Sequence, residues 1–98
     1  MPSYVLSNKA VEDLATIWNF TAEHWSETQA DKYYFKILKC CNELAEQKLR
    51  GKNYSNIWEG LFGFKLQNHI IFFMKTSPTN IEIIRILHQR MDYRNNFK

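Results

Sequence analysis

The sequence is poor in the residues that build several common kinds of site. Of its 98 residues, three are glycine, two are proline and two are cysteine. With so little glycine and no glycine-rich phosphate loop, the chain does not resemble P-loop or dinucleotide-binding enzymes. Cys40 and Cys41 are adjacent, have no third cysteine to pair with and lack the spacing of metal ligands. The sequence therefore predicts no disulfide, no metal and no cofactor. We expect Cys41 in the core and Cys40 to be incidental.

Long hydrophobic runs are also absent. The longest, residues 70–74, suits a buried strand and is far shorter than a membrane span. Residues 1–7 lack a basic segment followed by an apolar one, so no signal peptide is expected. The length of the chain fits one domain, residues 1–98. These features predict a cytoplasmic protein that does not contact the membrane.

What the chain does have is aromatic residues and a small excess of positive charge. It holds seven Phe, five Tyr and three Trp, and its formal net charge is +3. So many aromatics indicate either an aromatic core or surface residues reserved for a partner. The charge suits an acidic partner, or a target already carrying nucleic acid, and is equally compatible with an ordinary cytosolic protein.

Hydrophobic periodicity predicts two helices after a short opening strand at residues 4–6. Ser7 is a candidate N-cap for a helix over 8–24. Ser26 and Gln29 form a capping box for a second helix reaching about residue 49, so the pair should form an antiparallel hairpin. The expected apolar stripes are Val11, Leu14, Ala15, Trp18, Ala22 and Trp25 on the first helix, and Ala30, Tyr33, Tyr34, Ile37, Cys41, Leu44 and Ala45 on the second. Burial is expected above all for Leu14, Trp18, Ile37 and Cys41.

The second half of the chain predicts a sheet. Strands are expected at 62–66, 69–75 and 81–87, with a weaker one at 57–59. Gln67-Asn68 suits a two-residue hairpin turn, although the usual glycine is missing. The strand at 81–87 is apolar on both faces and should be central. Helices followed by strands indicate an α+β fold in which the hairpin covers one face of an antiparallel sheet.

The most distinctive polar cluster follows the last strand. Arg85, His88, Arg90 and Asp92 fall within eight positions. One interpretation is a hydrated strand end in which Asp92 pairs with an arginine. The other is a recognition site held by a rigid strand. His69, at the start of an apolar strand, is expected to be a hydrogen-bonded structural histidine.

Residues 86–92, Ile-Leu-His-Gln-Arg-Met-Asp, closely resemble the closing motif of ParE toxins in the RelE/ParE superfamily. The likeness extends over nearly the whole chain: residues 4–7 with Ala10 and Asp13-Leu14, then Gln29-Ala30 with Tyr33, Gly51 and residues 57–60, and finally residues 69–73. It implies a helix hairpin on a curved antiparallel sheet. It also implies the toxin of a type II toxin–antitoxin pair, which inhibits DNA gyrase by binding rather than by catalysis. The target-binding residues implied are Arg85, His88, Arg90 and Asp92.

Two alternatives stay open. RelE relatives cut messenger RNA on the ribosome, which needs an acid, a base and cations near the phosphate. Lys65, Lys75, Arg85 and Arg90 could supply charge, and Tyr93 or His88 could be acid or base. However, His88 and Asp92 make the motif similar to ParE, and the tail lacks the Arg/Tyr grouping of RelE nucleases. The other alternative is an interaction module without toxicity. The chain departs from the family at Phe73, Met74 and Lys75 and at Phe62 and Lys65, where tyrosine or arginine is common, which leaves the target open.

The resemblance also implies a partner. A ParD-like antitoxin with a DNA-binding, dimerising part should hold the toxin in a hetero-oligomer through an amphipathic segment that orders on contact. Ile17, Phe20, Trp58 and Phe62 are the expected antitoxin contacts, with core packing as the equally open alternative for each. No sequence-specific nucleic-acid binding is expected of this chain itself.

Overall fold

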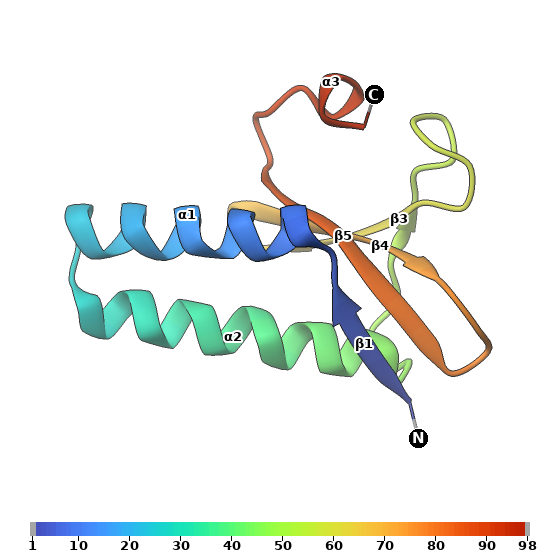
Figure 1. Cartoon of the computed structure of the whole chain (residues 1–98), viewed down its shortest axis with the longest axis horizontal. Coiled ribbons are helices and arrows are strands. Elements are labelled where there is room, and N and C mark those ends of the chain that lie inside the picture. The colour runs from blue at the N-terminus through green and yellow to red at the C-terminus, as the bar shows by residue number, and fades with distance from the viewer. Residues whose placement is uncertain (1, 98) are drawn as a thin grey trace.

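The computed structural model describes residues 2–97; Met1 and Lys98, the outer ends of the N-terminal segment and of the polar tail, lie outside them. Along the chain a short strand precedes two long helices, and the remaining strands follow (Figure 1). The elements are β1 (Ser3–Leu6), α1 (Asn8–His24), α2 (Glu27–Ala45), β2 (Lys52–Asn53), β3 (Phe62–Leu66), β4 (His69–Lys75), β5 (Asn80–His88) and α3 (Tyr93–Asn96). None of the helices in this part of the chain is long and apolar enough to cross a membrane.

The strands form one open five-stranded sheet in the order β1-β5-β4-β3-β2. β5 lies inside the sheet, as its apolar sequence predicted. The contacts among β2, β3, β4 and β5 are antiparallel, as expected for the late strands, whereas the opening strand β1 pairs with β5 in parallel. The difference is topological: the chain leaves β1 through the helix hairpin and returns along the sheet before β5, a crossover that only parallel pairing needs.

The β3–β4 hairpin turns at Gln67-Asn68, as predicted, with Leu66 paired to His69. Gln67 has φ of 54°, the left-handed region that glycine occupies more easily. The weak strand expected at 57–59 is wrong, because these residues lie in a turn-rich loop between β2 and β3. Backbone bonds within this loop run from Ile57 N and Trp58 N to Tyr54 O, which replaces pairing with another strand.

Both predicted caps open their helices. The hydroxyl of Ser7 accepts from Ala10 N at 3.0 Å, and that of Ser26 accepts from Gln29 N at 3.1 Å. With so short a break between them, α1 and α2 lie side by side (Figure 1). The second helix ends at Ala45, a few residues before the predicted end.

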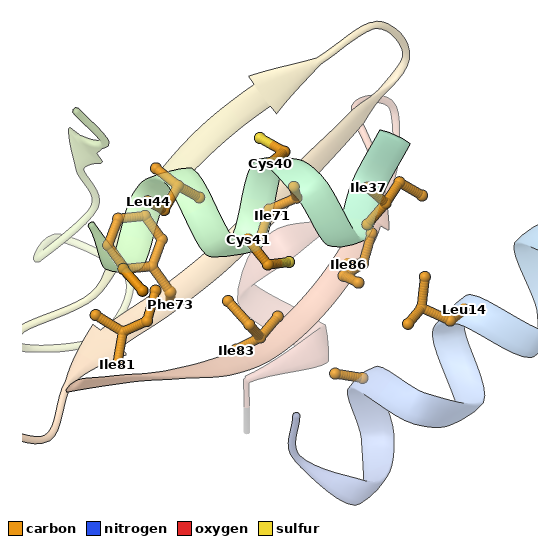
Figure 2. Packing of buried hydrophobic residues seen from close by; sticks show 12 residues of the cluster. Leu14, Ile37, Cys40, Cys41, Leu44, Ile71, Phe73, Ile81, Ile83 and Ile86 are labelled. Atoms are coloured by element: carbon orange, nitrogen blue, oxygen red, sulfur yellow. The ribbon is translucent and has the colours of Figure 1, made fainter. Parts of the chain in front are cut away.

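The main core cluster lies between the helix hairpin and one face of the sheet (Figure 2). Every residue of the predicted α2 stripe is buried or half-buried. Cys41 is fully buried as expected, but Cys40 is only 4% exposed, so its interpretation as incidental is wrong. The α2 residues pack on side chains from β4 and β5: Ile71, Phe73, Ile81, Ile83 and Ile86.

The buried face of α1 is displaced from the predicted stripe. Leu14 is buried as expected, but the other residues facing the sheet are Ala10 and the half-buried Ile17. Trp18, expected to be buried, is half-exposed, and its indole nitrogen donates to Asp31 on α2 at 2.9 Å. The sequence offers apolar residues on more than one side of this helix, and packing selects the side with the small Ala10. Of the predicted stripe, the exposed members are Val11, Ala15 and Trp25.

A second cluster fills the opposite sheet face. Leu61 and Phe72 are fully buried there, and the β2–β3 loop and the C-terminal segment pack over them. The rings of Tyr93 and Phe97 meet Phe72 edge-on, with centroids 5.2 and 5.1 Å away. The C-terminal segment therefore packs over this face of the sheet with its aromatic residues.

Candidate functional site

Arg85 of the closing segment, residues 85–92, lies inside the protein rather than at its surface. Its Nε and Nη2 donate to the two carboxylate oxygens of Asp13 on α1, both at 2.9 Å. The side chains of this pair are 13% and 14% exposed. Arg85 Nη1 also donates to the carbonyl of Asn96 in α3 at 3.3 Å. The hydrogen bond to Asp13 is the main reason that the pKa of Arg85 is raised. Arg85 thus ties β5 to α1 and α3.

The same contact closes an open strand edge. Pairing between β1 and β5 ends at Leu6 and Ile83, so beyond that point β5 has β4 on one side and no strand on the other. Ser7 donates its hydroxyl to Ile84 O at 2.7 Å, and Asp13 accepts from Ile86 N at 2.9 Å. The start of α1 therefore satisfies the backbone groups that β1 leaves unpaired.

Asp92 does not pair with either arginine of the closing segment, contrary to the ion-pair interpretation. It is the N-cap of α3 and accepts from Arg94 N at 3.2 Å and from the Asn95 side-chain amide at 2.6 Å. Tyr93, the next residue, donates its hydroxyl to Gln89 O, and burial is the main cause of its raised pKa. These bonds give the turn between β5 and α3 a defined shape.

His88 lies directly opposite His69 in the β4–β5 ladder, and their ring centroids are 5.5 Å apart. The Nδ1 of His69 is 2.7 Å from the Tyr33 hydroxyl, and the same hydroxyl lies 3.3 Å from Leu66 O. Burial is the main cause that lowers the pKa of His69 to about 4, and the neighbouring His88 lowers it further. His69 is thus a hydrogen-bonded histidine, as expected, and neutral at physiological pH.

Arg90 is the member of the closing segment whose charge faces solvent. Its backbone amide donates to His88 Nδ1 at 3.2 Å. Its side chain is exposed and makes no ion pair or hydrogen bond with residues 2–97. Of the four residues that the sequence grouped together, Arg85 is a partly buried tie, Asp92 caps α3 from an exposed position, His88 lines a groove and Arg90 presents a free guanidinium.

That groove, with a volume of about 720 Å³, lies beside α1, α2 and the ends of β4 and β5. Ile17, Phe20 and Trp25 give it apolar walls, and Lys32 and Lys36 also line it. Phe20 and Trp25 are exposed. Two of the four expected antitoxin contacts, Ile17 and Phe20, therefore meet in one groove.

The other two expected contacts lie elsewhere. Trp58 is exposed on the β2–β3 loop. Phe62 is half-buried, and its ring stacks on Phe73 with centroids 5.8 Å apart. Phe62 is therefore mainly a core residue.

The groups considered for RNA cleavage are not assembled into one site. Lys65 and Lys75 are exposed, Lys65 near the β3–β4 turn and Lys75 at the far end of β4. Across residues 2–97 there is no group of three or more His, Cys, Asp or Glu side chains that could hold a metal ion.

Sequence reasoning missed Asp13 and Tyr33 as partners of the site. Asp13 is 72 residues from Arg85 and Tyr33 is 36 residues from His69. The available signal was in the resemblance, which included both residues without giving them a role. An acidic residue in the second turn of a helix has no local sign that it will meet an arginine on a distant strand.

Comparison with known proteins gives first the class of fold. A solved structure titled "Chromosomal ParDE TA system from P. aeruginosa" matches with a TM-score of 0.76 at 21% identity, over 90% of this chain and 96% of that one. At this identity the match concerns the fold: a helix hairpin on an open sheet. The family model described as "ParE toxin of type II toxin-antitoxin system, parDE" matches residues 4–93.

Curated relatives agree with that model. Toxin ParE1 of Caulobacter vibrioides is 31% identical over 94 residues, 96% of each chain. Toxin ParE1 of Mycobacterium tuberculosis is 30% identical over 89 residues, 91% of each chain. Toxin ParE of Escherichia coli is 27% identical over 92 residues, 94% of this chain and 89% of that one. The chain belongs to the ParE toxin family of type II toxin–antitoxin systems.

Proposed function

We propose that this chain is a toxin that inhibits DNA gyrase by binding it in the cytoplasm, without catalysis, and that a cognate antitoxin neutralises it. Membership of the ParE family supports the toxin role. The observation that carries the proposed mode of action is the closing segment, in which Arg90 is exposed on a turn that neighbouring bonds hold in shape. An unpaired arginine on such a turn suits phosphate or carboxylate groups on a protein–DNA target.

Within this proposal the four residues have different roles. Arg90 contacts the target, and His88 supports its backbone from the strand end. Arg85 and Asp92 act as positioning residues, because their side chains are engaged with Asp13 and with the start of α3. Arg85 and Asp92 are then polar because they position Arg90, and not because they contact the target themselves.

The arrangement favours binding over RNA cleavage. Tyr93 is a poor acid–base candidate because its hydroxyl already donates to Gln89 O and burial raises its pKa. His88 uses Nδ1 for the Arg90 amide. General acid–base catalysis needs two such groups facing one substrate. In this chain Tyr93 and His88 instead form hydrogen bonds to the backbone of the turn.

The test is a paired assay on purified toxin: gyrase supercoiling and cleavage, and ribosome-dependent cleavage of messenger RNA. Arg90→Ala should raise the toxin concentration needed to inhibit gyrase by about tenfold or more, as for an arginine hot spot. Arg50→Ala, another exposed arginine beyond the end of α2, is the matched control and should act like the wild type.

The paired assay separates the alternatives. Codon-positioned RNA cuts with untouched gyrase would replace the proposal with the RelE-like nuclease, and Tyr93 and His88 would then be tested first. Inactivity of the wild-type chain in both assays would favour a non-toxic interaction module. Retained gyrase inhibition in Arg90→Ala would show that Arg90 does not contact gyrase.

We further propose that the antitoxin, a ParD-like protein with a DNA-binding, dimerising part, inserts an amphipathic segment into the groove beside α1 and α2. Ile17, Phe20 and Trp25 offer apolar contacts, and Lys32 and Lys36 suit acidic residues on the polar side of such a segment. Trp58 and Phe62 lie outside the groove; Trp58 is exposed enough to meet an extension of the segment. Dimerisation of the antitoxin would give a hetero-oligomer.

This part is tested with the product of a neighbouring short gene that has a DNA-binding N-terminus and an acidic C-terminus. Phe20→Ala should weaken the complex by about tenfold in calorimetry. Phe35→Ala is the control, because Phe35 is a comparably exposed phenylalanine on α2 that does not line the groove. Equal effects of the two changes would contradict the proposal that the antitoxin binds in the groove. The absence of co-elution of the wild-type pair at micromolar concentration would also contradict it.

A further inference from the structure

The pair of histidines in the groove has a geometry that the proposed function does not use. His69 and His88 face each other from adjacent antiparallel strands, and both line the groove. Their ring centroids are 5.5 Å apart. Two imidazoles that bind one tetrahedral ion at about 2.0–2.1 Å per nitrogen have centroids roughly 5 Å apart. The backbone register therefore holds the rings at about the separation that a shared ion requires.

The hydrogen bonds of His69 leave the correct nitrogen available. In the tautomer of His69 that carries its proton on Nδ1, the Tyr33 hydroxyl accepts that proton while its own proton goes to Leu66 O. The neutral ring then carries its lone pair on Nε2, which bonds to none of residues 2–97. A partner that fixes the tautomer and orientation of a histidine in this way is the usual support of a metal ligand.

His88 needs one adjustment. Its Nδ1 accepts from the Arg90 amide at 3.2 Å, which places the proton of the neutral ring on Nε2. Coordination through Nε2 moves that proton to Nδ1 and releases the amide, which lies on an exposed turn and can bond to water.

We propose that His69 and His88 form a binding site for a borderline divalent cation such as Zn²⁺, with the remaining coordination positions open to solvent in the groove. Imidazole nitrogens suit Zn²⁺, Cu²⁺ and Ni²⁺ and do not suit Mg²⁺ or Ca²⁺. With two protein ligands the site is an accessory one, not a closed structural centre.

The test is calorimetric titration of the purified toxin with Zn²⁺ at neutral pH. The wild type should bind one ion per chain with micromolar affinity, and Mg²⁺ should not bind. Either His69→Gln or His88→Gln should abolish binding in that range. His24→Gln is the matched control: His24 lies at the end of α1, with Nδ1 bonded to Phe20 O, and its loss should leave the titration unchanged.

A supporting residue gives a sharper check. Tyr33→Phe removes the hydroxyl that orients His69 and should weaken Zn²⁺ binding by about tenfold or more, while both ligands remain. His88→Gln keeps the test valid if His69→Gln does not fold, because His88 is half-exposed and its replacement leaves the Tyr33–His69 contact in place. Absence of Zn²⁺ binding to the wild type at micromolar concentration, or binding that survives both His69→Gln and His88→Gln, would overturn the site. Equal loss in His24→Gln would point to nonspecific binding and overturn it too.

Discussion

At the scale of single residues, the contact between Arg85 and Asp13 organises the candidate site. It joins β5 to α1 through two charge-assisted bonds, and the same carboxylate covers the Ile86 amide. An arginine that looked like a recognition residue in the sequence is therefore an internal tie. The charge available for recognition lies five residues later, at Arg90.

Asp13→Asn should lower the free energy of unfolding by about 3 kcal/mol, because it leaves the guanidinium of Arg85 poorly solvated and without its charge partner. The measurement is urea denaturation followed by circular dichroism. Glu46→Gln is the control, since its ion pair with Lys48 is exposed and should contribute less than about 1 kcal/mol. Equal effects of the two substitutions would mean that the internal contact is no stronger than a surface pair.

His69 should make stability depend on pH. Its pKa is about 4 in the folded protein, below the ordinary value of 6.5. Between these two values the unfolded chain binds more protons than the folded one, so stability should fall as the pH drops from about 6.5 to about 4. His69→Gln should make the urea midpoint depend less on pH across this window, whereas His24→Gln should leave that dependence unchanged. An unchanged slope in His69→Gln would assign the dependence to other groups.

At the scale of elements, the β3–β4 hairpin uses a non-glycine residue where glycine would be easier. Gln67 has a positive φ, and its neighbour Asn68 does not. The two-residue turn is held by the register of its strands, which pair from Leu66 and His69 outward. The strain is local, so it can be removed without touching the core.

Gln67→Gly should therefore stabilise the protein by up to about 1 kcal/mol, since it relieves a left-handed backbone conformation. Asn68→Gly is the matched control at the adjacent position and should be neutral or destabilising, because it adds only freedom to the unfolded chain. Thermal and urea denaturation of both variants provide the measurement. Stabilisation by Asn68→Gly alone would mean that the strain lies at the other position.

At the scale of the whole molecule, one sheet supports two hydrophobic clusters. Ile37 belongs to the cluster under the helices, and Leu61 to the cluster under the loop and the C-terminal segment. Both are fully buried. β4 and β5 contribute residues to both clusters. Unfolding of one cluster therefore disrupts strands on which the other cluster depends.

We expect residues 2–97 to unfold as one unit. Ile37→Ala and Leu61→Ala should each lower the free energy of unfolding by about 2–5 kcal/mol, with coincident transitions by circular dichroism and tryptophan fluorescence. Val5→Ala, at an exposed position on β1, is the control and should have a small effect. Two separate transitions in either core variant would show that the cluster under the β2–β3 loop and the C-terminal segment unfolds by itself.

Elements that depend on local chemistry could be predicted from the order of the residues alone. Ser7 and Ser26 start the two helices because each hydroxyl satisfies an amide three residues away. The α2 stripe was correct because its apolar residues lie on one side, and the positions of the three late strands followed from their apolar patterns. The closing motif likewise identified the family, since a run of consecutive residues is visible without a structure.

Only the tertiary structure decided the features that join distant residues. Which side of α1 is buried depends on the sheet beneath it, and residues 57–59 form a loop because no neighbouring strand edge receives them. The roles of Arg85 and His69 depend on Asp13 and Tyr33, which the fold brings to them from far along the chain. Periodicity reports on neighbours within an element, whereas a site is made where elements meet.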